Sequence, residues 1–453
     1  MLPENQIICG DNIKVMHGWP DNCIPTIICD PPYGLSFMGK KWDYQVPSIE
    51  EWQECLRVLK PGGTLLCFAG SRTQHRMACN VEDAGFIIKD CIMWLYGSGF
   101  PKATDISKQL DKGHEREVVG DNPNARPNTH LGKESTSGSI GYGVYPYNPI
   151  TAPATPEAQL WNGWKSHGLK PAYEPILVAM KPNDGTYAEN ALKWGVSGLW
   201  IDGGRIPKSA GDRTEYGVNG IERSKNNNVY GEQSGKIQFD GTQGRFPANI
   251  ILDEETGAML DEQSGESKSQ QARTASNRYI SGNDMSKMAG ENKFRISDTN
   301  PNNTHDDSGG ASRFFYCAKA SKKERNAGCE GLEKKQTWAS QEIRESNSFD
   351  VFESDGRPKT LNRNNHPTVK PLALMEYLCN LTKTPTGGIV LDPYCGSGTT
   401  CKAAQNTGRR FIGIDKNPEY CEIARQRLEA VDTGVPVKEQ RKGQGALFPK
   451  DNQ

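Results

Sequence analysis

Short apolar runs alternate with helix-length amphipathic segments through the N-terminal part of the chain. The runs that predict strands are NQIICG from Asn5, TIICD from Thr26, TLLCFAG from Thr64 and FIIKDCIMWLY from Phe86. The segments with helical periodicity follow Asp11, extend from Ser48 to Lys60, and extend from about Ser71 to Asp83. This alternation predicts a parallel, doubly wound α/β sheet with helices on both faces.

The middle of the chain lacks this alternation. Residues from about Lys112 to Trp164 are rich in Gly, Pro, Asn and Thr, and the stretch from Glu262 to Gly310 is polar. A polar stretch of that composition buries little surface, so we expect a mobile loop or a surface that becomes ordered on binding. Isolated apolar runs predict further strands at EPILVAMKP (174–182), FPANIILD (246–253) and RFFYCAKA (313–320).

Regular structure is predicted again near the C-terminus. The segment HPTVKPLALMEYLCNLT (366–382) has a proline at the start of an apolar helical face. It is followed by strand, glycine turn and helix (387–405), a strand RFIGID (410–415) and an amphipathic helix (419–431). Two α/β blocks therefore flank an irregular middle.

Composition adds few constraints. The formal net charge is −1, so any nucleic-acid surface must gather its basic residues on one face. The thirteen cysteines form no CxxC pair and no zinc-type cluster, so we expect buried free thiols in a reducing cytosol. The N-terminus lacks the pattern of a signal peptide, and no apolar run approaches the ~20 residues of a membrane span. These features predict a cytoplasmic protein without membrane contact.

The glycine turn IVLDPYCGSGTT predicts a nucleotide-type ligand site. Gly396 and Gly398 follow an apolar strand directly and precede a helix, which permits positive φ and close approach of a ligand. A dinucleotide fingerprint has a third small residue where this chain has Cys401. Asp392 would repel a pyrophosphate but suits an ammonium, and Asp415, at the end of the next strand, suits ribose hydroxyls. A nucleoside that carries an amino acid, such as S-adenosylmethionine, fits these features.

The motif DPPY predicts a site that grips an exocyclic amine. Asp30 lies at the carboxyl end of a predicted strand, where open α/β sheets bind ligands. Pro31 and Pro32 fix the backbone, so that the nearby carbonyls are rigid acceptors. A carboxylate and a carbonyl can receive both hydrogens of an adenine amine, which directs its lone pair toward a methyl donor. Tyr33 offers a ring for stacking of the base, Gly34 leaves room, and no metal is required.

With these motifs the sequence resembles an amino-methylating DNA methyltransferase of the DPPY type. DPPY precedes the cofactor glycines, as in the β-type order of motifs, and the pattern is similar to methylases of phages and prophages. The resemblance implies a Rossmann-like S-adenosylmethionine-dependent fold and transfer to adenine N6 of flipped-out DNA bases. It places Trp94 and the turn Phe100-Pro101-Lys102 near the substrate.

The resemblance also assigns candidate site residues. The catalytic set is Asp30, Pro31, Pro32 and Tyr33. The cofactor set is Asp11, Asn12, Asp30, Thr368, Lys370, Asp392, Pro393, Tyr394, Gly396, Gly398, Thr399 and Asp415. One departure is the pair Tyr394-Cys395 where the family has an aromatic before the glycines, which predicts modified packing of the cofactor loop.

The resemblance further implies an organisation into domains. The expected parts are a catalytic half at 1–205 with a loop insertion at about 112–165, a target-recognition insert at 206–310, a cofactor-binding half at 311–432 and a polar tail at 433–453. DNA is the implied substrate, and the recognition sequence and oligomeric state are not implied. The tail segment QGALF (Gln444 to Phe448) resembles a peptide that docks on bacterial sliding clamps, and the basic run Lys322, Lys323 and Arg325 is a candidate phosphate contact or a solvated helix face.

Other activities fit less well. Cytosine-N4 methylation is the main alternative, but it is more often associated with Ser at the position of Asp30. Cytosine-C5 methylation needs a cysteine nucleophile after proline, and the chain has no Pro-Cys dipeptide. Methylation of a protein amide or of RNA remains open, although Asn is usual there in place of Asp30. The missing third glycine and the DPPY motif disfavour a nicotinamide-dependent oxidoreductase, and the intact motif disfavours a binding module without catalysis.

Overall fold

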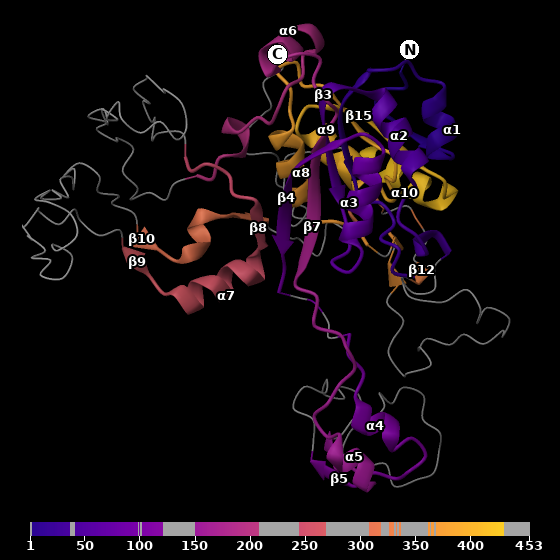
Figure 1. Cartoon of the computed structure of the whole chain (residues 1–453), viewed down its shortest axis with the longest axis vertical. Helices are drawn as coiled ribbons and strands as arrows, with labels where there is room; N and C mark the ends of the chain where they lie inside the picture. The colour runs from indigo at the N-terminus through magenta and orange to yellow at the C-terminus, as the bar shows by residue number, and fades with distance from the viewer. Residues whose placement is uncertain are drawn as a thin grey trace, which may run out of the picture. The chain divides into compact units, whose positions relative to one another are not determined.

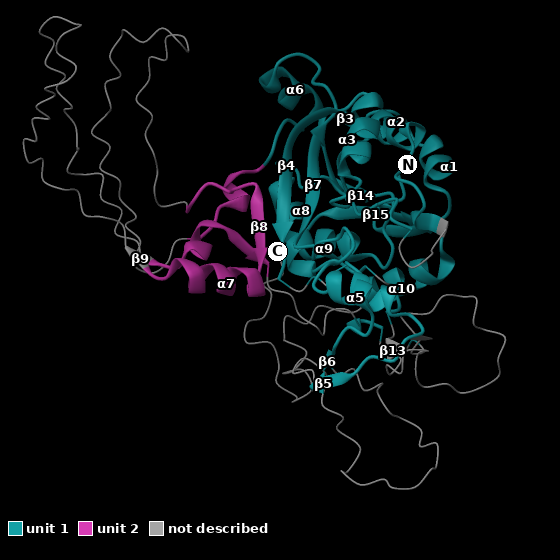
Figure 2. Cartoon of the chain, turned by 60° about the horizontal axis from the view of Figure 1, so that its bottom comes forward, with its two compact units in different colours: residues 1–199, 319–453 teal, residues 200–318 magenta. Residues whose placement is uncertain are grey.

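The computed structural model describes most of the chain in two compact units. The described residues are 2–36, 41–97, 99, 102–120, 150–207, 244–268, 308–318, 326–329, 332, 335–336, 361–362, 364–366 and 368–429. Unit 1 comprises Met1–Leu199 and Lys319–Gln453, and unit 2 comprises Trp200–Ala318 (Figure 2).

Seven strands in the described part of unit 1 form one sheet, in the order β1-β15-β14-β2-β3-β7-β4. Their bounds are β1 Gln6–Cys9, β2 Ile24–Cys29, β3 Leu59–Phe68, β4 Ile87–Leu95, β7 Tyr173–Met180, β14 Ile389–Asp392 and β15 Arg410–Asp415. Figure 1 shows that strands from the two ends of the chain meet in this sheet, so the two α/β blocks predicted from the sequence form one structure.

The α/β class predicted from the sequence is confirmed, but the sheet is mixed and not wholly parallel. The neighbours from β1 to β3 pair in parallel. Strand β7 is antiparallel to β3 and to β4, with Cys67 opposite Leu177 and Trp94 opposite Glu174. Six of the eight residues of β7 are buried. A strand that is buried on both faces reads as a continuous apolar run in either direction, so the pattern could not predict its orientation.

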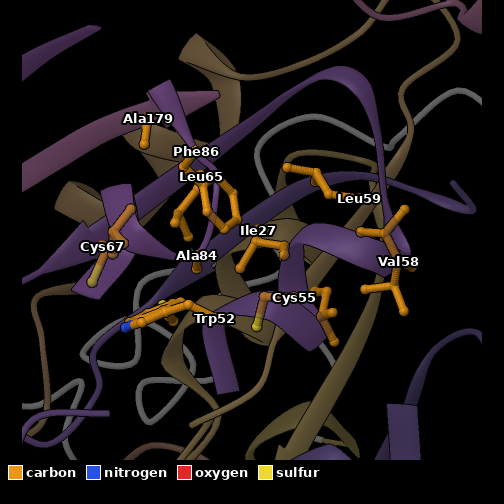
Figure 3. Packing of buried hydrophobic residues seen from close by; sticks show 14 of the residues in the cluster. Ile27, Trp52, Cys55, Val58, Leu59, Leu65, Cys67, Ala84, Phe86 and Ala179 are labelled. Atoms are coloured by element: carbon orange, nitrogen blue, oxygen red, sulfur yellow. The ribbon is translucent and has the colours of Figure 1, made fainter. Parts of the chain in front are cut away.

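Helices cover both faces of this sheet. The helices are α1 Asn12–His17, α2 Ile49–Val58, α3 Gln74–Asp83, α8 Leu372–Leu381, α9 Thr399–Asn406 and α10 Pro418–Glu429. Trp52 of α2 packs with Ile27 of β2 and Leu65 of β3 in a core to which α1 and α3 also contribute (Figure 3). The alternate strand residues Ile28 and Leu66 are also fully buried, because successive side chains of a strand point to opposite faces.

Strand β3 begins earlier than its sequence predicts. The Pro61-Gly62-Gly63 segment was expected to separate a helix from a strand that starts at Thr64, but α2 ends at Val58 and β3 begins at Leu59. Leu59 pairs with Ile24, and the register shifts before Thr26 pairs with Thr64. Gly62 has a φ of +72° at this irregularity, a conformation that suits glycine.

Several short elements of unit 1 were not predicted. They are η2 Lys41–Asp43, α4 Ile106–Leu110, β5 Val118–Gly120, β6 Ile150–Thr151, α5 Pro156–Leu160, α6 Tyr187–Trp194, β12 Lys335–Gln336 and β13 Leu361–Asn362. Helix α6 has a capping box, because the Thr186 side chain accepts from the Glu189 N–H and the Glu189 side chain accepts from the Thr186 N–H. The expected loop insertion at 112–165 therefore contains short regular elements among its described residues.

Unit 2 is built from short elements. Its elements are η3 Asp202–Gly204, β8 Ile250–Asp253, α7 Glu254–Ser264, β9 Ser267–Lys268, β10 Ser308–Gly309, η5 Ala311–Phe314 and β11 Tyr316–Ala318. The predicted strands at 246–253 and 313–320 correspond to β8 and β11, which pair in parallel. Helix α7 was not predicted, and it is capped by Asp253, whose Oδ1 accepts from the Thr256 N–H at 2.7 Å.

Several sequence-based expectations lie outside the described residues. These are Phe100 and Pro101, the basic run at 322–325, most of the polar stretch 262–310, and the tail 433–453 with its QGALF segment. Within the described parts of the chain, no helix is both long enough and apolar enough to cross a membrane.

Candidate active site

The two motif loops lie side by side at one edge of the sheet. Strands β2 and β14 are parallel neighbours, with Leu391 paired to Ile27. Asp30 follows β2 and Asp392 ends β14, so both carboxylates lie at the carboxyl ends of adjacent parallel strands. We call Asp30–Leu35 the β2 loop and Pro393–Gly398 the glycine turn. This adjacency is the arrangement that amine methylation requires, because the target amine and the methyl donor must meet.

Asp30 belongs to a compact cluster of four polar side chains. Its Oδ1 accepts from the Tyr33 hydroxyl at 2.6 Å, and its Oδ2 accepts from the Lys370 ammonium at 2.6 Å. The Lys370 Nζ atom is also 3.2 Å from the Tyr33 Oη atom and 3.2 Å from the Glu174 Oε2 atom. The Glu174 Oε2 atom is in turn 3.2 Å from the Tyr33 Oη atom. One ammonium is thus shared by two carboxylates and a hydroxyl.

The charged groups of this cluster interact strongly because they are largely shielded from water. The Lys370 side chain is 8% exposed, and those of Asp30 and Glu174 are 17% and 22% exposed. Burial acts to lower the pKa of Lys370, but the charges of Asp30 and Glu174 outweigh it and raise that pKa above its usual value. Burial raises the pKa of Tyr33, and the same two carboxylates raise it further, so the phenol is neutral. The resemblance had assigned Lys370 to the cofactor set, whereas its ammonium contacts the DPPY residues.

A further carboxylate, that of Asp43, holds the backbone of the β2 loop, although the sequence did not single it out. Oδ1 of Asp43 accepts from the backbone N–H groups of Tyr33 at 2.6 Å and Gly34 at 3.0 Å, and its Oδ2 accepts from that of Leu35 at 3.2 Å. Asp43 is 2% exposed. Pro31 and Pro32 have no N–H to offer, so the three amides that follow them are the ones that a buried anion can order.

The glycine turn has the backbone conformation that the sequence predicted. Gly396 has a φ of +50° and Gly398 has a φ of +77°. A Cβ atom on Gly396 would lie 2.6 Å from His366 Nε2, and one on Gly398 would lie 2.8 Å from the Cβ of Ala424. Both glycines are therefore demanded by backbone conformation and by contact with this chain's own side chains. His366 packs edge-on against Tyr420, with ring centroids 4.5 Å apart.

The turn is fixed from three sides by hydrogen bonds. Asp392 Oδ1 accepts from the Tyr394 N–H at 3.0 Å, and Asp415 Oδ2 accepts from the Gly396 N–H at 2.9 Å. Arg427 of α10, which is 4% exposed, donates to Ser397 O at 2.6 Å and to Thr399 Oγ1 at 3.0 Å. Thr399, predicted to contact the cofactor, thus has its hydroxyl engaged by Arg427. Pro393 is buried in the same turn.

Cys401 explains how the chain dispenses with a third glycine. The thiol is buried beneath the turn, where a Cβ atom on Gly413 of β15 would lie 2.7 Å from its Sγ atom. In this chain the strand residue Gly413 leaves room for the Cys401 side chain of α9, so α9 and β15 approach closely without a third glycine on the helix.

Residues at the start of α1 connect to the glycine turn through Glu51 of α2. Asp11 caps α1, and its side chain accepts from the Lys14 N–H. The buried Asn12 has its Nδ2 3.5 Å from Glu51 Oε1, which also accepts from the Tyr394 hydroxyl at 3.1 Å. Tyr394 therefore remains the aromatic before the glycines, and its phenol has a polar partner. Thr368 lies in the loop that leads to Lys370.

The charges around the turn fit a cationic ligand. Burial raises the pKa of Asp392 to about 7, and the nearby charges of Asp30 and Asp415 act in the same direction against hydrogen bonds from Thr400 and Tyr394. Burial also raises the pKa of Asp415. A bound cation would stabilise the ionised form of these buried carboxyl groups, and S-adenosylmethionine carries an ammonium and a sulfonium. Asp392 and Asp415 therefore fit this cofactor.

Sequence reasoning missed Asp43, Glu174, Glu51 and Arg427. Glu174 stands in the apolar run EPILVAMKP, but the assumption of a parallel sheet put the start of that strand at the opposite edge. The antiparallel direction of β7 brings Glu174 opposite Trp94, at the carboxyl end of β4. For Glu51, the pattern S-x-x-E from Ser48 is a visible capping signal, although it does not predict the contact with Tyr394.

Comparisons with known proteins identify similar sequences. The type II methyltransferase M2.DpnII of Streptococcus pneumoniae is 55% identical over 65 residues, which are 14% of this chain and 24% of that protein. The DNA adenine methyltransferase YhdJ of Escherichia coli (strain K12) is 48% identical over 65 residues, which are 14% of this chain and 22% of that protein. The chain thus spans about a quarter of the length of these curated relatives.

Among solved structures, the cytosine-N4-specific PvuII DNA methyltransferase is 12% identical, with a TM-score of 0.39 over 96% of this chain and 89% of that chain. A family model described as DNA methylase, N6_N4_Mtase, matches residues 24–426. Because this match spans most of the chain, the chain belongs to the N6/N4 DNA methylase family, whose cofactor is S-adenosylmethionine.

Proposed function

We propose that this chain transfers a methyl group from S-adenosylmethionine to the exocyclic N6 amine of adenine in DNA. Membership of the family supports a DNA methyltransferase that acts on N6 of adenine or N4 of cytosine. The observation that carries the proposal is the Asp30 carboxylate, which is held by Tyr33 and Lys370 beside the glycine turn.

In the proposed reaction, the amine donates its two N–H groups to the Asp30 carboxylate and to a carbonyl of the Pro31-Pro32 segment. The nitrogen lone pair then faces the methyl carbon that the cofactor supplies on a positively charged sulfur. A carbon–nitrogen bond forms as the carbon–sulfur bond breaks, the sulfur keeps that electron pair, and the nitrogen loses one proton to solvent. Positioning and local charge supply the acceleration, without a covalent intermediate.

The target base must leave the duplex, because its amine otherwise lies within the stack. We propose that the flipped base lies on the ring of Tyr33, whose hydroxyl bonds to Asp30 and whose N–H bonds to Asp43 fix the plane of the ring. Trp94 and Lys102 are proposed to lie near the substrate, as the resemblance implies.

We propose that the cofactor contacts follow the charges of the site. Asp392 would face the ammonium of the methionine part, Asp415 the ribose hydroxyls, and Asp11 and Asn12 the adenine. Thr368, Pro393, Tyr394 and Thr399 would shape the pocket around the glycines. Lys370 would act mainly through Asp30, because oxygens of Asp30, Tyr33 and Glu174 surround its ammonium.

Adenine is proposed over cytosine because the first residue of the motif is Asp30, where Ser is more usual for cytosine-N4 enzymes. The relative YhdJ of Escherichia coli, a DNA adenine methyltransferase, is consistent with that choice. The test is mass spectrometry of nucleosides from DNA of cells that express the chain, beside cells that express Asp30→Ala. N6-methyladenine in the first sample alone supports the proposal, whereas N4-methylcytosine replaces it with the cytosine alternative. Absence of both overturns it.

Two further assignments remain proposals. We propose that residues 206–310 select the target sequence, which single-molecule sequencing of the same DNA would read out as a motif. We also propose that QGALF in the tail docks on a bacterial sliding clamp. A chain that ends before Gln444 should then lose co-purification with the clamp and retain methylation of naked DNA, while unchanged co-purification would remove the tail from this role.

A further inference from the structure

We propose that Glu174 is a positioning residue for methyl transfer, which holds the Lys370 ammonium so that the Asp30 carboxylate keeps room for the target amine. This inference rests on the proposed function. It assigns a role to a strand residue that belongs neither to the DPPY motif nor to the glycine turn.

The first argument is geometric. Glu174 lies at the second position of β7, and its antiparallel direction brings this residue to the edge of the sheet where β2 and β3 end. Its Oε2 atom is 3.2 Å from both the Lys370 Nζ atom and the Tyr33 Oη atom. Glu174 therefore contacts both groups that bond to Asp30, and it reaches Asp30 only through them.

The second argument is a count of donors and acceptors. An ammonium has three N–H groups, and within the described part of the chain Lys370 has three oxygen neighbours within 3.2 Å: one each from Asp30, Tyr33 and Glu174. The Tyr33 hydroxyl donates its single hydrogen to Asp30 at 2.6 Å while it accepts from Lys370. Every donor of the cluster is thus directed at an oxygen, and among the described residues each Asp30 oxygen receives one side-chain hydrogen bond.

A carboxylate oxygen accepts two hydrogen bonds, so each oxygen of Asp30 retains one acceptor position. Those positions are what the amine of a base needs. If the Glu174 charge were removed, the ammonium would be attracted by Asp30 alone and would move toward a contact with both of its oxygens. This movement would occupy an acceptor position of Asp30 without touching the glycine turn.

The third argument concerns charge. Lys370 has its Nζ atom 5.1 Å from the centroid of the Phe68 ring and 5.4 Å from that of the Tyr33 ring, in a setting with little solvent. A buried ammonium between two carboxylates is held by both, and neutralising Glu174 would leave Lys370 paired with Asp30 alone. Glu174 therefore stabilises the position of Lys370 as well as its charge.

The test compares Glu174→Gln, Lys370→Met and the double variant with the parent chain. DNA from a methyltransferase-deficient bacterial strain is the substrate, and labelled methyl incorporation is followed at saturating cofactor. Glu174→Gln keeps size and polarity, so it isolates the charge. We expect it to lower kcat by about 10- to 100-fold, while the Kd for S-adenosylmethionine changes by less than about threefold. Glu82→Gln, in which an exposed acid of α3 is neutralised, is the matched control and should retain the parental kcat.

The double variant distinguishes positioning from a separate role. If Glu174 acts through Lys370, the double variant should be no slower than Lys370→Met alone, since effects within one network are not additive. A parental kcat for Glu174→Gln, a matching loss of cofactor affinity, or a double variant that shows the product of the two single losses would each overturn the inference. If the parent methylates no DNA base, the proposed function fails instead.

Discussion

The β2 loop and the glycine turn lie at the same edge of one sheet, yet they are held in different ways. The glycine turn is fixed by Asp392, Asp415 and Arg427, which lie within about 30 residues of it along the chain. The β2 loop is held by the nearby Asp43 and also by distant residues, because the contact between Lys370 and Asp30 joins positions 340 residues apart. The glycine turn is therefore ordered by residues near it along the chain, whereas Asp30 is also ordered by a charged side chain from a distant element.

This difference implies that the two loops serve different steps, cofactor binding and methyl transfer. Positive φ angles and close contacts fix the backbone of the glycine turn, and the carboxyl group of Asp392 suits a cationic cofactor. The β2 loop instead presents a carboxylate whose orientation depends on a network. Changes in the loop should therefore affect transfer, while changes around the turn should affect cofactor binding.

The largest effect is expected at Asp30. Asp30→Ala removes the proposed acceptor for the target amine, so we expect the rate of methyl transfer to fall by roughly 1000-fold or more. Cofactor affinity should stay within about threefold of the parent. Incorporation of labelled methyl groups and calorimetric titration with S-adenosylmethionine measure the two quantities. Transfer within tenfold of the parent would remove Asp30 from the reaction.

A smaller effect is expected at Asp43. Asp43→Ala leaves three backbone N–H groups of the β2 loop without their carboxylate, and each hydrogen bond to a charged group is worth about 1.5–3 kcal/mol. We expect kcat to fall by about 10- to 100-fold. The free energy of unfolding should fall by roughly 2–4 kcal/mol, as measured by denaturant titration. Asp43→Asn, which keeps one carbonyl oxygen, should be milder, and equal losses in the two variants would show that the retained oxygen does not hold the loop.

The pH dependence of cofactor binding tests the glycine turn. The pKa of Asp392 is raised to about 7 by burial, so its carboxyl group in the free protein is protonated below that pH. A cofactor ammonium favours the ionised form, so affinity should be constant above pH 7 and weaken by up to about tenfold per unit below it. Calorimetric titration from pH 5.5 to 8.5 measures this. Asp392→Asn should bind more weakly at pH 8 and show a flatter profile, and an unchanged profile would exclude Asp392.

The same carboxyl group should oppose folding of the free protein at high pH. Its pKa is higher in the folded state, at about 7, than the ordinary value of 3.8, so ionisation favours the unfolded chain as pH rises through this range. The unfavourable contribution is complete above pH 7 and amounts to at most about 4 kcal/mol. Asp392→Asn should therefore raise Tm at pH 8 while it weakens cofactor binding, and a lower Tm would show that the carboxylate stabilises the turn.

The smallest effect is expected at Tyr33. Stacking needs the ring of Tyr33 and not its hydroxyl, so Tyr33→Phe should keep substantial activity. The structure adds that the hydroxyl donates to Asp30 at 2.6 Å and accepts from Lys370, so we expect a loss of about 3- to 10-fold in kcat. Tyr33→Ala, which also removes the ring, should be slower still. Equal rates for Tyr33→Ala and the parent would rule out stacking.

The sequence alone located both motif loops. Apolar runs that end at Asp30 and Asp392 predicted strands, and β2 and β14 have those ends within one residue. The glycine pattern predicted positive φ at Gly396 and Gly398, and both have it. These predictions succeed because a strand, its flanking glycines and its capping residues act over a few positions of the chain.

The sequence determined the α/β class, the two motif loops and the family, because each depends on residues that are neighbours along the chain. Only the tertiary structure decided the direction of β7, the approach of Glu174 and Lys370 to Asp30, and the hold of Asp43 on the β2 loop. A buried strand has the same apolar pattern in either direction, and a charged side chain carries no local signal of its distant partner. One short motif therefore identifies Asp30 as the reactive carboxylate in the proposed reaction. The orientation of that carboxylate also depends on side chains that contact it only in the folded chain.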